Sequence, residues 1–223
     1  GTLTLNQMTA TRLFTRGQWF TVDGKGYSKT GTLRHAAGAD VPDFTRLALG
    51  LCLNSDATVS DSGVVVGDPT EAALVVLAAK LGVDAEETRR LYPRVAEVPF
   101  DSEYKFMVTF HHVPTEQGGF VATMKGAPDV VINRCSHVLT ADGVVPIEEA
   151  RAEIDEANQR MSEKGLRVLA FAVRTLKGRE AEAIADPVSE ASGFTFVALT
   201  GIIDPLRPEA IVAAHAAREA GIE

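Results

Sequence analysis

The chain alternates between short stretches rich in β-branched and aromatic residues and longer stretches in which apolar residues recur at helical spacing. The β-like stretches are mostly bounded by glycine, proline, asparagine or aspartate, as strands commonly are. These predicted strands lie at residues 8–14, 18–23, 95–100, 105–112, 119–125, 166–173 and 194–203. The last two, LRVLAFAV and FTFVALTGII, are apolar enough to lie in the middle of a sheet.

Short turns join neighbouring β-like stretches into predicted antiparallel hairpins. The first two stretches flank Arg16-Gly17, and the loop PTEQGG at 114–119 joins the stretches before and after it. A further hairpin over 137–146 is centred on Asp142-Gly143.

The clearest helix start is GDPTEAAL, where Asp68 is a candidate N-cap, Pro69 takes the first helical position and Glu71 the third, with Gly82 as a natural stop. The other predicted helices lie at residues 42–52, 84–91, 128–134, 148–165 and 207–223. The Ala/Glu-rich stretch 179–192 is expected to be a mobile loop. Hairpins interleaved with helices indicate an α+β fold, in which helices pack against a mostly antiparallel sheet.

Composition and charge exclude several classes of partner. The net charge is −8 and the acidic residues are spread along the chain, so no basic stripe suited to nucleic acid is present. No apolar run approaches the roughly 18 to 20 residues that span a bilayer. Cys52 and Cys135 have no CxxC or CxxH partner and the histidines lack ligand spacing, so we expect neither a disulfide framework nor a metal site.

The signatures of several common enzyme classes are missing. The sequence contains no GxSxG, no HExxH and no GxGxxG after a strand. The stretch GKGYSKTG at 24–31 resembles the end of a phosphate loop, but Ser28 stands where the second glycine belongs. The absence of these enzyme signatures favours a binding module over a self-contained enzyme.

The stretch MKGAPD at 124–129 combines features of a turn and of a ligand site. Lys125 ends a predicted strand, Gly126 lacks the Cβ that would keep a ligand from the backbone, and Pro128 starts a helix whose N-terminal amides face the same space. On these grounds alone, a simple turn and a ligand site are both open.

Other polar and aromatic residues have simple structural interpretations. Glu71 fits a capping box, and Phe100, which follows Pro99, fits a core position. Lys105 fits a solvated charge on a strand, and Arg167 fits an exposed position at the edge of the sheet.

Six motifs, in order, resemble the P-type cation-transport ATPases, specifically the calcium-pump-like P2 branch. They are GTLT, GDPTEAAL, PFDSEYKFM, KGAPD, KGLRVLAFA and GIIDPLRPE, spread over residues 1–220. In that family GTLT ends the signature that carries the phosphorylated aspartate, so the nucleophile would lie three residues before the start of this chain, ahead of Gly1. The resemblance implies a nucleotide-binding domain at 6–200, with a twisted antiparallel sheet, and truncated flanks of an α/β phosphorylation domain at 1–5 and 201–223.

The resemblance also implies a role for individual residues in binding the adenosine end of ATP. Glu71 matches the glutamate that approaches the adenine amino group, and Phe100 matches the aromatic residue that stacks on the base. Lys105 and Met107 match residues that line the same pocket.

Three further residues complete the implied site. Lys125 matches the lysine at the floor of the pocket, Gly126 gives the base room, and Arg167 matches the arginine that reaches the β-phosphate, where a guanidinium fork suits phosphate oxygens. No catalytic residue and no metal ligand is expected within the chain itself. Mg²⁺ accompanies ATP in the whole enzyme.

The implied function is that of an ATP-binding domain that aims the γ-phosphate at an aspartate on the phosphorylation domain. Its partners would be ATP and the phosphorylation, actuator and transmembrane domains of one pump, which makes it a cytoplasmic domain of an integral membrane protein. We expect the isolated chain to be monomeric and to bind ATP without turnover. One alternative is a regulatory protein-interaction domain that has lost nucleotide binding. Another is a soluble haloacid-dehalogenase-like phosphotransferase, which requires a DxDx[TV] aspartate pair that the sequence lacks.

Overall fold

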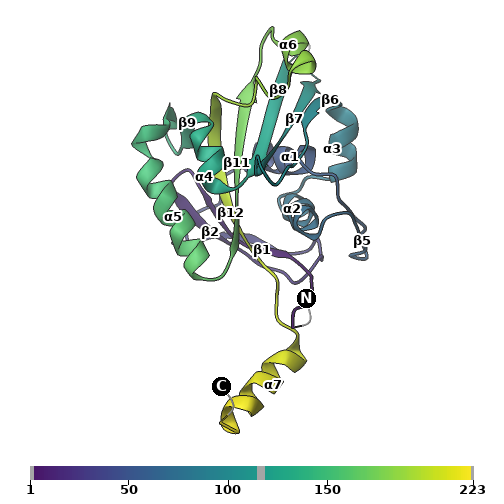
Figure 1. Ribbon diagram of the computed structural model, residues 1–223, viewed down its shortest axis with the longest axis vertical. Coiled ribbons are helices and arrows are strands. Elements are labelled where there is room, and N and C mark those ends of the chain that lie inside the picture. The colour runs from purple at the N-terminus through teal and green to yellow at the C-terminus, as the bar shows by residue number, and fades with distance from the viewer. Residues whose placement is uncertain (1–2, 115–118, 222–223) are drawn as a thin grey trace.

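The computed structural model describes residues 3–114 and 119–221. Most of the predicted loop at 114–119 and the first and last two residues lie outside the described residues. Within them, helices pack on both faces of one large, mostly antiparallel sheet, which confirms the predicted α+β class (Figure 1).

The main sheet has the strand order β3-β2-β1-β12-β11-β8-β7-β6, with β9 and β10 attached beside β12. Its strands are β1 (Thr9–Thr15), β2 (Gln18–Val22), β3 (Leu33–His35), β6 (Arg94–Val98), β7 (Phe106–Val113), β8 (Gly119–Gly126), β9 (Cys135–Thr140), β10 (Gly143–Pro146), β11 (Arg167–Thr175) and β12 (Phe194–Ile203). Neighbouring strands are antiparallel except β12 and β9, which run parallel. The two stretches predicted to be central, β11 and β12, lie in the middle of the sheet as expected.

Helices flank the sheet, and a separate small hairpin is formed by β4 (Thr58–Val59) and β5 (Val65–Val66). The helices are α1 (Thr45–Leu53), α2 (Pro69–Lys80), α3 (Ala85–Leu91), α4 (Pro128–Asn133), α5 (Arg151–Glu163), α6 (Glu180–Ala185) and α7 (Pro208–Glu219), with a 3₁₀ turn at Ile147–Glu149. In Figure 1, α1, α2 and α3 lie on one side of the sheet and α4 and α5 on the other.

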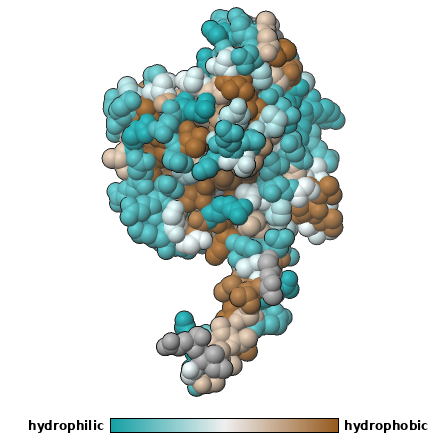
Figure 2. Space-filling model, in the orientation of Figure 1, coloured by the Kyte–Doolittle hydropathy of each residue, from teal (hydrophilic) through white to brown (hydrophobic). Residues whose placement is uncertain are grey.

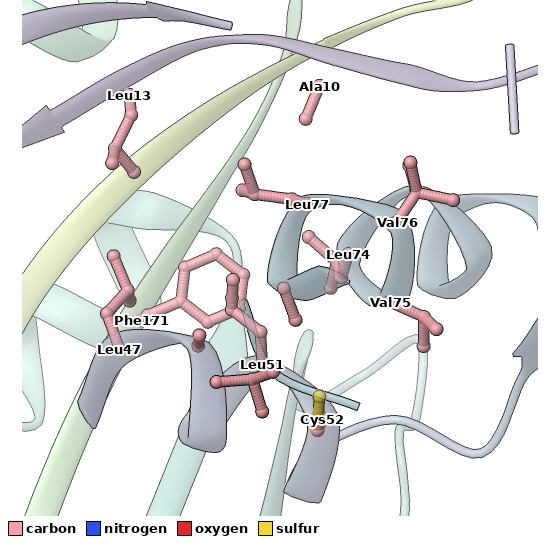
Figure 3. Close-up of a cluster of buried hydrophobic side chains, with 14 of the residues drawn as sticks. Ala10, Leu13, Leu47, Leu51, Cys52, Leu74, Val75, Val76, Leu77 and Phe171 are labelled. Atoms are coloured by element: carbon pink, nitrogen blue, oxygen red, sulfur yellow. The ribbon is translucent and has the colours of Figure 1, made fainter. Parts of the chain in front are cut away.

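Each face of the sheet has its own hydrophobic core. On one face, residues of α1 and α2 meet β1 and β11, as Leu51, Leu74 and Phe171 illustrate (Figure 3). On the other face, Phe106 of β7 packs in a cluster that includes Ile154 of α5. Because side chains alternate along a strand, one strand contributes to both cores. The same alternation determines which residues of β7, β8 and β11 face α1 and α2.

The stretch 179–192 differs from the expected mobile loop. Residues Glu180–Ala185 form α6. Glu190, within the stretch expected to be mobile, is buried and pairs with Arg174 at 3.2 Å and with Arg179 at 2.5 Å. A buried carboxylate needs such partners. Glu190, one of the glutamates behind the loop prediction, therefore holds this segment against the rest of the domain.

The two predicted flanks lie side by side. The N–H of Leu5 donates to the carbonyl of Pro205 at 2.9 Å, and the N–H of Arg207 donates to the carbonyl of Leu3 at 2.9 Å. Helix α7 has no buried residue among those described and projects from the body, with apolar side chains on its surface (Figures 1 and 2). The division into 6–200 and two flanks remains a prediction, and β12 crosses its second boundary.

The first flank begins with the GTLT motif, of which the first two residues lie outside the described residues. Gly1, ahead of which the resemblance places the phosphorylated aspartate, lies outside the described residues. The described part of this flank begins at Leu3, whose carbonyl bonds to Arg207 as given above. The location of the nucleophile before Gly1 therefore stays a prediction from the GTLT motif.

Among the described residues, no helix combines the length and the hydrophobicity needed to cross a membrane.

Candidate functional site

Glu71 lies in the first turn of α2, and the helix start forms as the sequence predicts. Asp68 accepts a hydrogen bond from the N–H of Glu71 at 3.0 Å, and Pro69 occupies the first helical position. The Glu71 carboxylate does not complete a capping box, however. Its Oε2 accepts from the backbone N–H groups of Asp56 at 2.7 Å and Ala57 at 3.1 Å, so the side chain binds the segment between α1 and β4 and not its own helix end.

Lys125 points from β8 into the space between the sheet and the ends of α1 and α2. Its side chain is buried, with 6% of the residue exposed. The ammonium donates to the backbone carbonyl of Asn54 and, at 2.6 Å, to Oε1 of Glu71. The structure therefore joins two residues 54 positions apart in sequence into a charged, hydrogen-bonded pair.

The surroundings shift the pKa values of both partners. Burial is the main influence on Lys125 and lowers its pKa, and the Glu71 carboxylate offsets part of this effect. Burial alone would raise the pKa of Glu71, but the Lys125 ammonium and the N–H groups of Asp56 and Ala57 outweigh it and lower that pKa. The carboxylate is therefore held ionised, as a buried acid with several donors should be.

Lys105, Met107 and Gly126 lie beside this pair. Met107 is the cross-strand partner of Lys125, and Phe106 is the partner of Gly126. A Cβ on Gly126 would lie 2.8 Å from the Cα of Phe106, so the glycine allows β7 and β8 to approach closely. The expectation that Gly126 makes room for a base stays a prediction.

Lys105 differs from the predicted strand position. It immediately precedes β7, has a φ of 59° and is exposed. Its N–H donates to the carbonyl of Asp101 at 2.7 Å, and its carbonyl accepts from the N–H of Ala127 at 3.0 Å. The backbone of Lys105 is thereby fixed next to the start of α4, while its side chain is left at the surface.

Phe100 and Arg167 occupy surface positions near the same elements. The core interpretation of Phe100 is wrong: β6 ends at Val98 and Phe100 is 61% exposed. Arg167 begins β11 and is exposed, as expected, but β11 is an interior strand of the sheet and not an edge strand. Its Nη1 donates to Oγ1 of Thr70 at 2.8 Å. Because Thr70 precedes Glu71, this bond ties β11 to the same helix start.

The end of β8 and the starts of β7 and β11 meet at one end of the sheet, below the first turn of α2. The structure thus brings together Glu71, Lys125, Met107, Gly126 and the backbone of Lys105, and connects Arg167 through Thr70. None of the seven residues singled out by the resemblance lines the cavity of about 670 Å³ between α1 and the sheet. The candidate site combines the exposed residues Phe100, Lys105 and Arg167 with a buried, charged floor formed by Lys125 and Glu71.

Sequence reasoning missed three groups that contact the charged pair: the backbone carbonyl of Asn54 and the backbone N–H groups of Asp56 and Ala57. The only local signal was a polar run, Asn54-Ser55-Asp56, immediately after an apolar helix. Backbone donors have no sequence signature, so only the fold reveals them.

Among the described residues, no group of three or more His, Cys, Asp or Glu side chains is placed to hold a metal ion. Cys52 and Cys135 are buried free thiols, and burial raises the pKa of each to about 12.

Comparison with known proteins points to one family. The model of the P-type ATPase cytoplasmic domain N matches residues 43–209. The cation-transporting ATPase pma1 of Synechocystis is 39% identical over the whole chain, which covers 25% of that protein. The calcium-transporting ATPase 1 of Lactococcus lactis is 33% identical, and the mouse calcium-transporting ATPase type 2C member 2 is 34% identical, each over the whole chain and 23% of the relative. The chain thus spans about a quarter of the length of these relatives.

Proposed function

The chain belongs to the P-type ATPase family, matching its cytoplasmic domain N, and on this premise we propose that it binds ATP at the end of the sheet marked by Glu71 and Lys125. The observation that carries the proposal is the 2.6 Å contact between these two side chains. A buried ion pair is weak evidence for stability, because desolvation offsets much of the attraction. The Glu71–Lys125 ion pair lies beside exposed residues that come from the same six motifs, and this location favours a binding role.

The groups at the site suit the parts of a nucleotide. Phe100 presents an exposed aromatic ring on which a base can stack. Glu71 offers carboxylate oxygens that can accept from an exocyclic amino group. Lys125 forms the floor, with Met107 opposite it on β7. Arg167 supplies guanidinium donors at the rim, which match phosphate oxygens.

The proposal for the whole protein extends this role. ATP, with Mg²⁺, would bind with its γ-phosphate directed outward, toward an aspartate on a phosphorylation domain that precedes and follows this domain in the chain. The protein's own residues here would hold and orient ATP, because positioning is a large part of phosphoryl-transfer catalysis. The complete protein would be a membrane cation pump with actuator and transmembrane domains, and the isolated domain a monomer without ATP turnover.

An amide-resolved NMR titration tests the proposal, with ATP as the ligand and AMP and GTP as comparisons. Saturable shifts are expected at residues 71, 100, 105, 125–127 and 167, with ATP bound more tightly than GTP. The absence of a saturable shift at millimolar ATP would instead favour a domain that has lost nucleotide binding.

A pair of variants tests the orientation of the phosphates. Arg167→Gln is expected to weaken ATP binding by about tenfold, or ~1.4 kcal/mol, and to leave AMP binding nearly unchanged. Lys164→Gln removes an exposed positive charge three positions earlier and should change neither. Equal losses for ATP and AMP in Arg167→Gln, or equal losses of ATP binding in both variants, would contradict the assigned direction of the phosphates.

A further inference from the structure

Asn54 joins α1 to the two strands that carry the candidate site. It directly follows α1, and its N–H donates to the carbonyl of Gly50 at 3.0 Å. Its side chain is buried, with 1% of the residue exposed. The carboxamide Nδ2 donates to the carbonyl of Thr123 on β8 at 2.7 Å and to the carbonyl of Met107 on β7 at 3.2 Å. These bonds offset the cost of burying the Nδ2 group, whereas Oδ1 has no hydrogen-bond partner in the described part of the chain.

The backbone that follows Asn54 holds both charged groups of the site. The carbonyl of Asn54 accepts from the Lys125 ammonium, while the N–H groups of Asp56 and Ala57 donate to Glu71. Residues 54–57 therefore contact the lysine at one end and the glutamate at the other. The location of this segment determines where both charges lie.

The lysine keeps a donor for a ligand. An ammonium has three N–H donors, and the described part of the chain engages two of them, with Asn54 and Glu71. Because Lys125 is buried, its remaining donor can be aimed only if the two acceptors are fixed. Asn54 fixes one of them directly and, through Asp56 and Ala57, restrains the other.

We propose that Asn54 is a positioning residue for nucleotide binding, which anchors residues 54–57 to β7 and β8 so that Lys125 and Glu71 are held in place before ATP arrives. This inference rests on the ATP-binding function proposed above. Its physical basis is preorganisation: a site that is already ordered loses less conformational entropy on binding.

The test compares Asn54→Ala with Thr109→Val. Thr109 is a buried neighbour whose Oγ1 lies 2.8 Å from Oγ1 of Thr123 and donates to the carbonyl of Leu53 at 3.3 Å. Thr109→Val removes these buried hydrogen bonds and the long 3.5 Å contact from Asn54 Nδ2 to Thr109 Oγ1, but it leaves the shorter bonds of Asn54 to the Thr123 and Met107 carbonyls. It is thus a matched control for a general loss of stability, which urea unfolding measures in both variants.

Asn54→Ala is expected to weaken ATP binding by about tenfold and to speed hydrogen exchange at the amides of Asp56 and Ala57 by about tenfold or more. Thr109→Val should change neither by more than about twofold. Asn54→Ser, which keeps one side-chain donor, should give intermediate values and serves as the test variant if the alanine variant does not fold.

Equal effects in Thr109→Val and the Asn54 variants would overturn the inference, because a structural role alone would then explain them. Unchanged exchange at Asp56 and Ala57 in the Asn54 variants would also overturn it. If the wild-type chain does not bind ATP, the proposed function fails, whereas the exchange rates of these two amides in the free protein still decide whether Asn54 positions the Glu71 carboxylate.

Discussion

His111 makes the stability of this domain depend on pH. It lies on β7, is 2% exposed, and its Nδ1 is 3.0 Å from the carbonyl of Tyr92. A carbonyl can only accept, so Nδ1 carries the proton of the neutral ring and Nε2 carries none. Burial, with a smaller contribution from Arg94, lowers the pKa of His111 to about 4, although the Tyr92 contact acts in the opposite direction.

The sign and size of the effect follow from the difference between folded and unfolded states. The unfolded chain binds a proton at His111 as the pH falls through about 6.5, while the folded chain remains neutral there until about pH 4. Stability from this residue is therefore complete above pH 6.5 and is lost as the pH falls toward 4. Between pH 7 and pH 5 the loss is about 2 kcal/mol.

Urea unfolding at pH 7 and pH 5 measures this loss. The wild-type protein should lose about 2 kcal/mol more than His111→Gln between the two pH values, since the variant lacks the titrating ring. His112→Gln is the matched control, because His112 is adjacent to His111 in sequence but its side chain is exposed. The His112→Gln variant should keep the pH dependence of the wild type. Equal losses in the wild type and His111→Gln would refute the reasoning.

Two further predictions concern nucleotide binding. Phe100→Ala should weaken ATP binding by about 1 to 3 kcal/mol through lost stacking and leave the unfolding free energy nearly unchanged, because the ring is exposed. Calorimetric titration measures this, with Tyr104→Ala, an exposed aromatic residue of the same segment, as the control; equal affinity in wild type and Phe100→Ala would remove Phe100 from the site. Lys125→Glu should abolish ATP binding, and it should also destabilise the fold because a second carboxylate would face Glu71. The neutral Lys125→Met tests the same role with less repulsion, and ATP binding retained in a folded variant would place Lys125 outside the site.

The elements that the sequence predicted correctly are those set by local chemistry. Arg16-Gly17 forms the first turn with positive φ at both residues, 55° and 71°, a conformation that two-residue hairpins favour. The start of α2 follows from Asp68 and Pro69, whose effects act within one helical turn. Such signals depend on neighbouring residues only, so they can be read without knowing the fold.

The position of β11 and β12 in the sheet was also predictable, because their continuous apolar character requires burial on both faces. The order of the six motifs along the chain likewise indicated the family. The fold class, most of the main elements and the family were thus predictable from the sequence, whereas the role of the residues assigned to the candidate site stays a prediction.

Only the tertiary structure decided where the side chains of the site go. Glu71 lies in a helix start that fits a capping box, yet its carboxylate binds Lys125 and the amides of residues 56 and 57. Phe100 is an aromatic residue that follows Pro99, yet it is exposed, and Asn54 gave almost no local signal although it links α1 to two strands. Each outcome depends on groups distant in sequence, because a side chain's partners are set by how strands and helices pack together and not by the residues beside it.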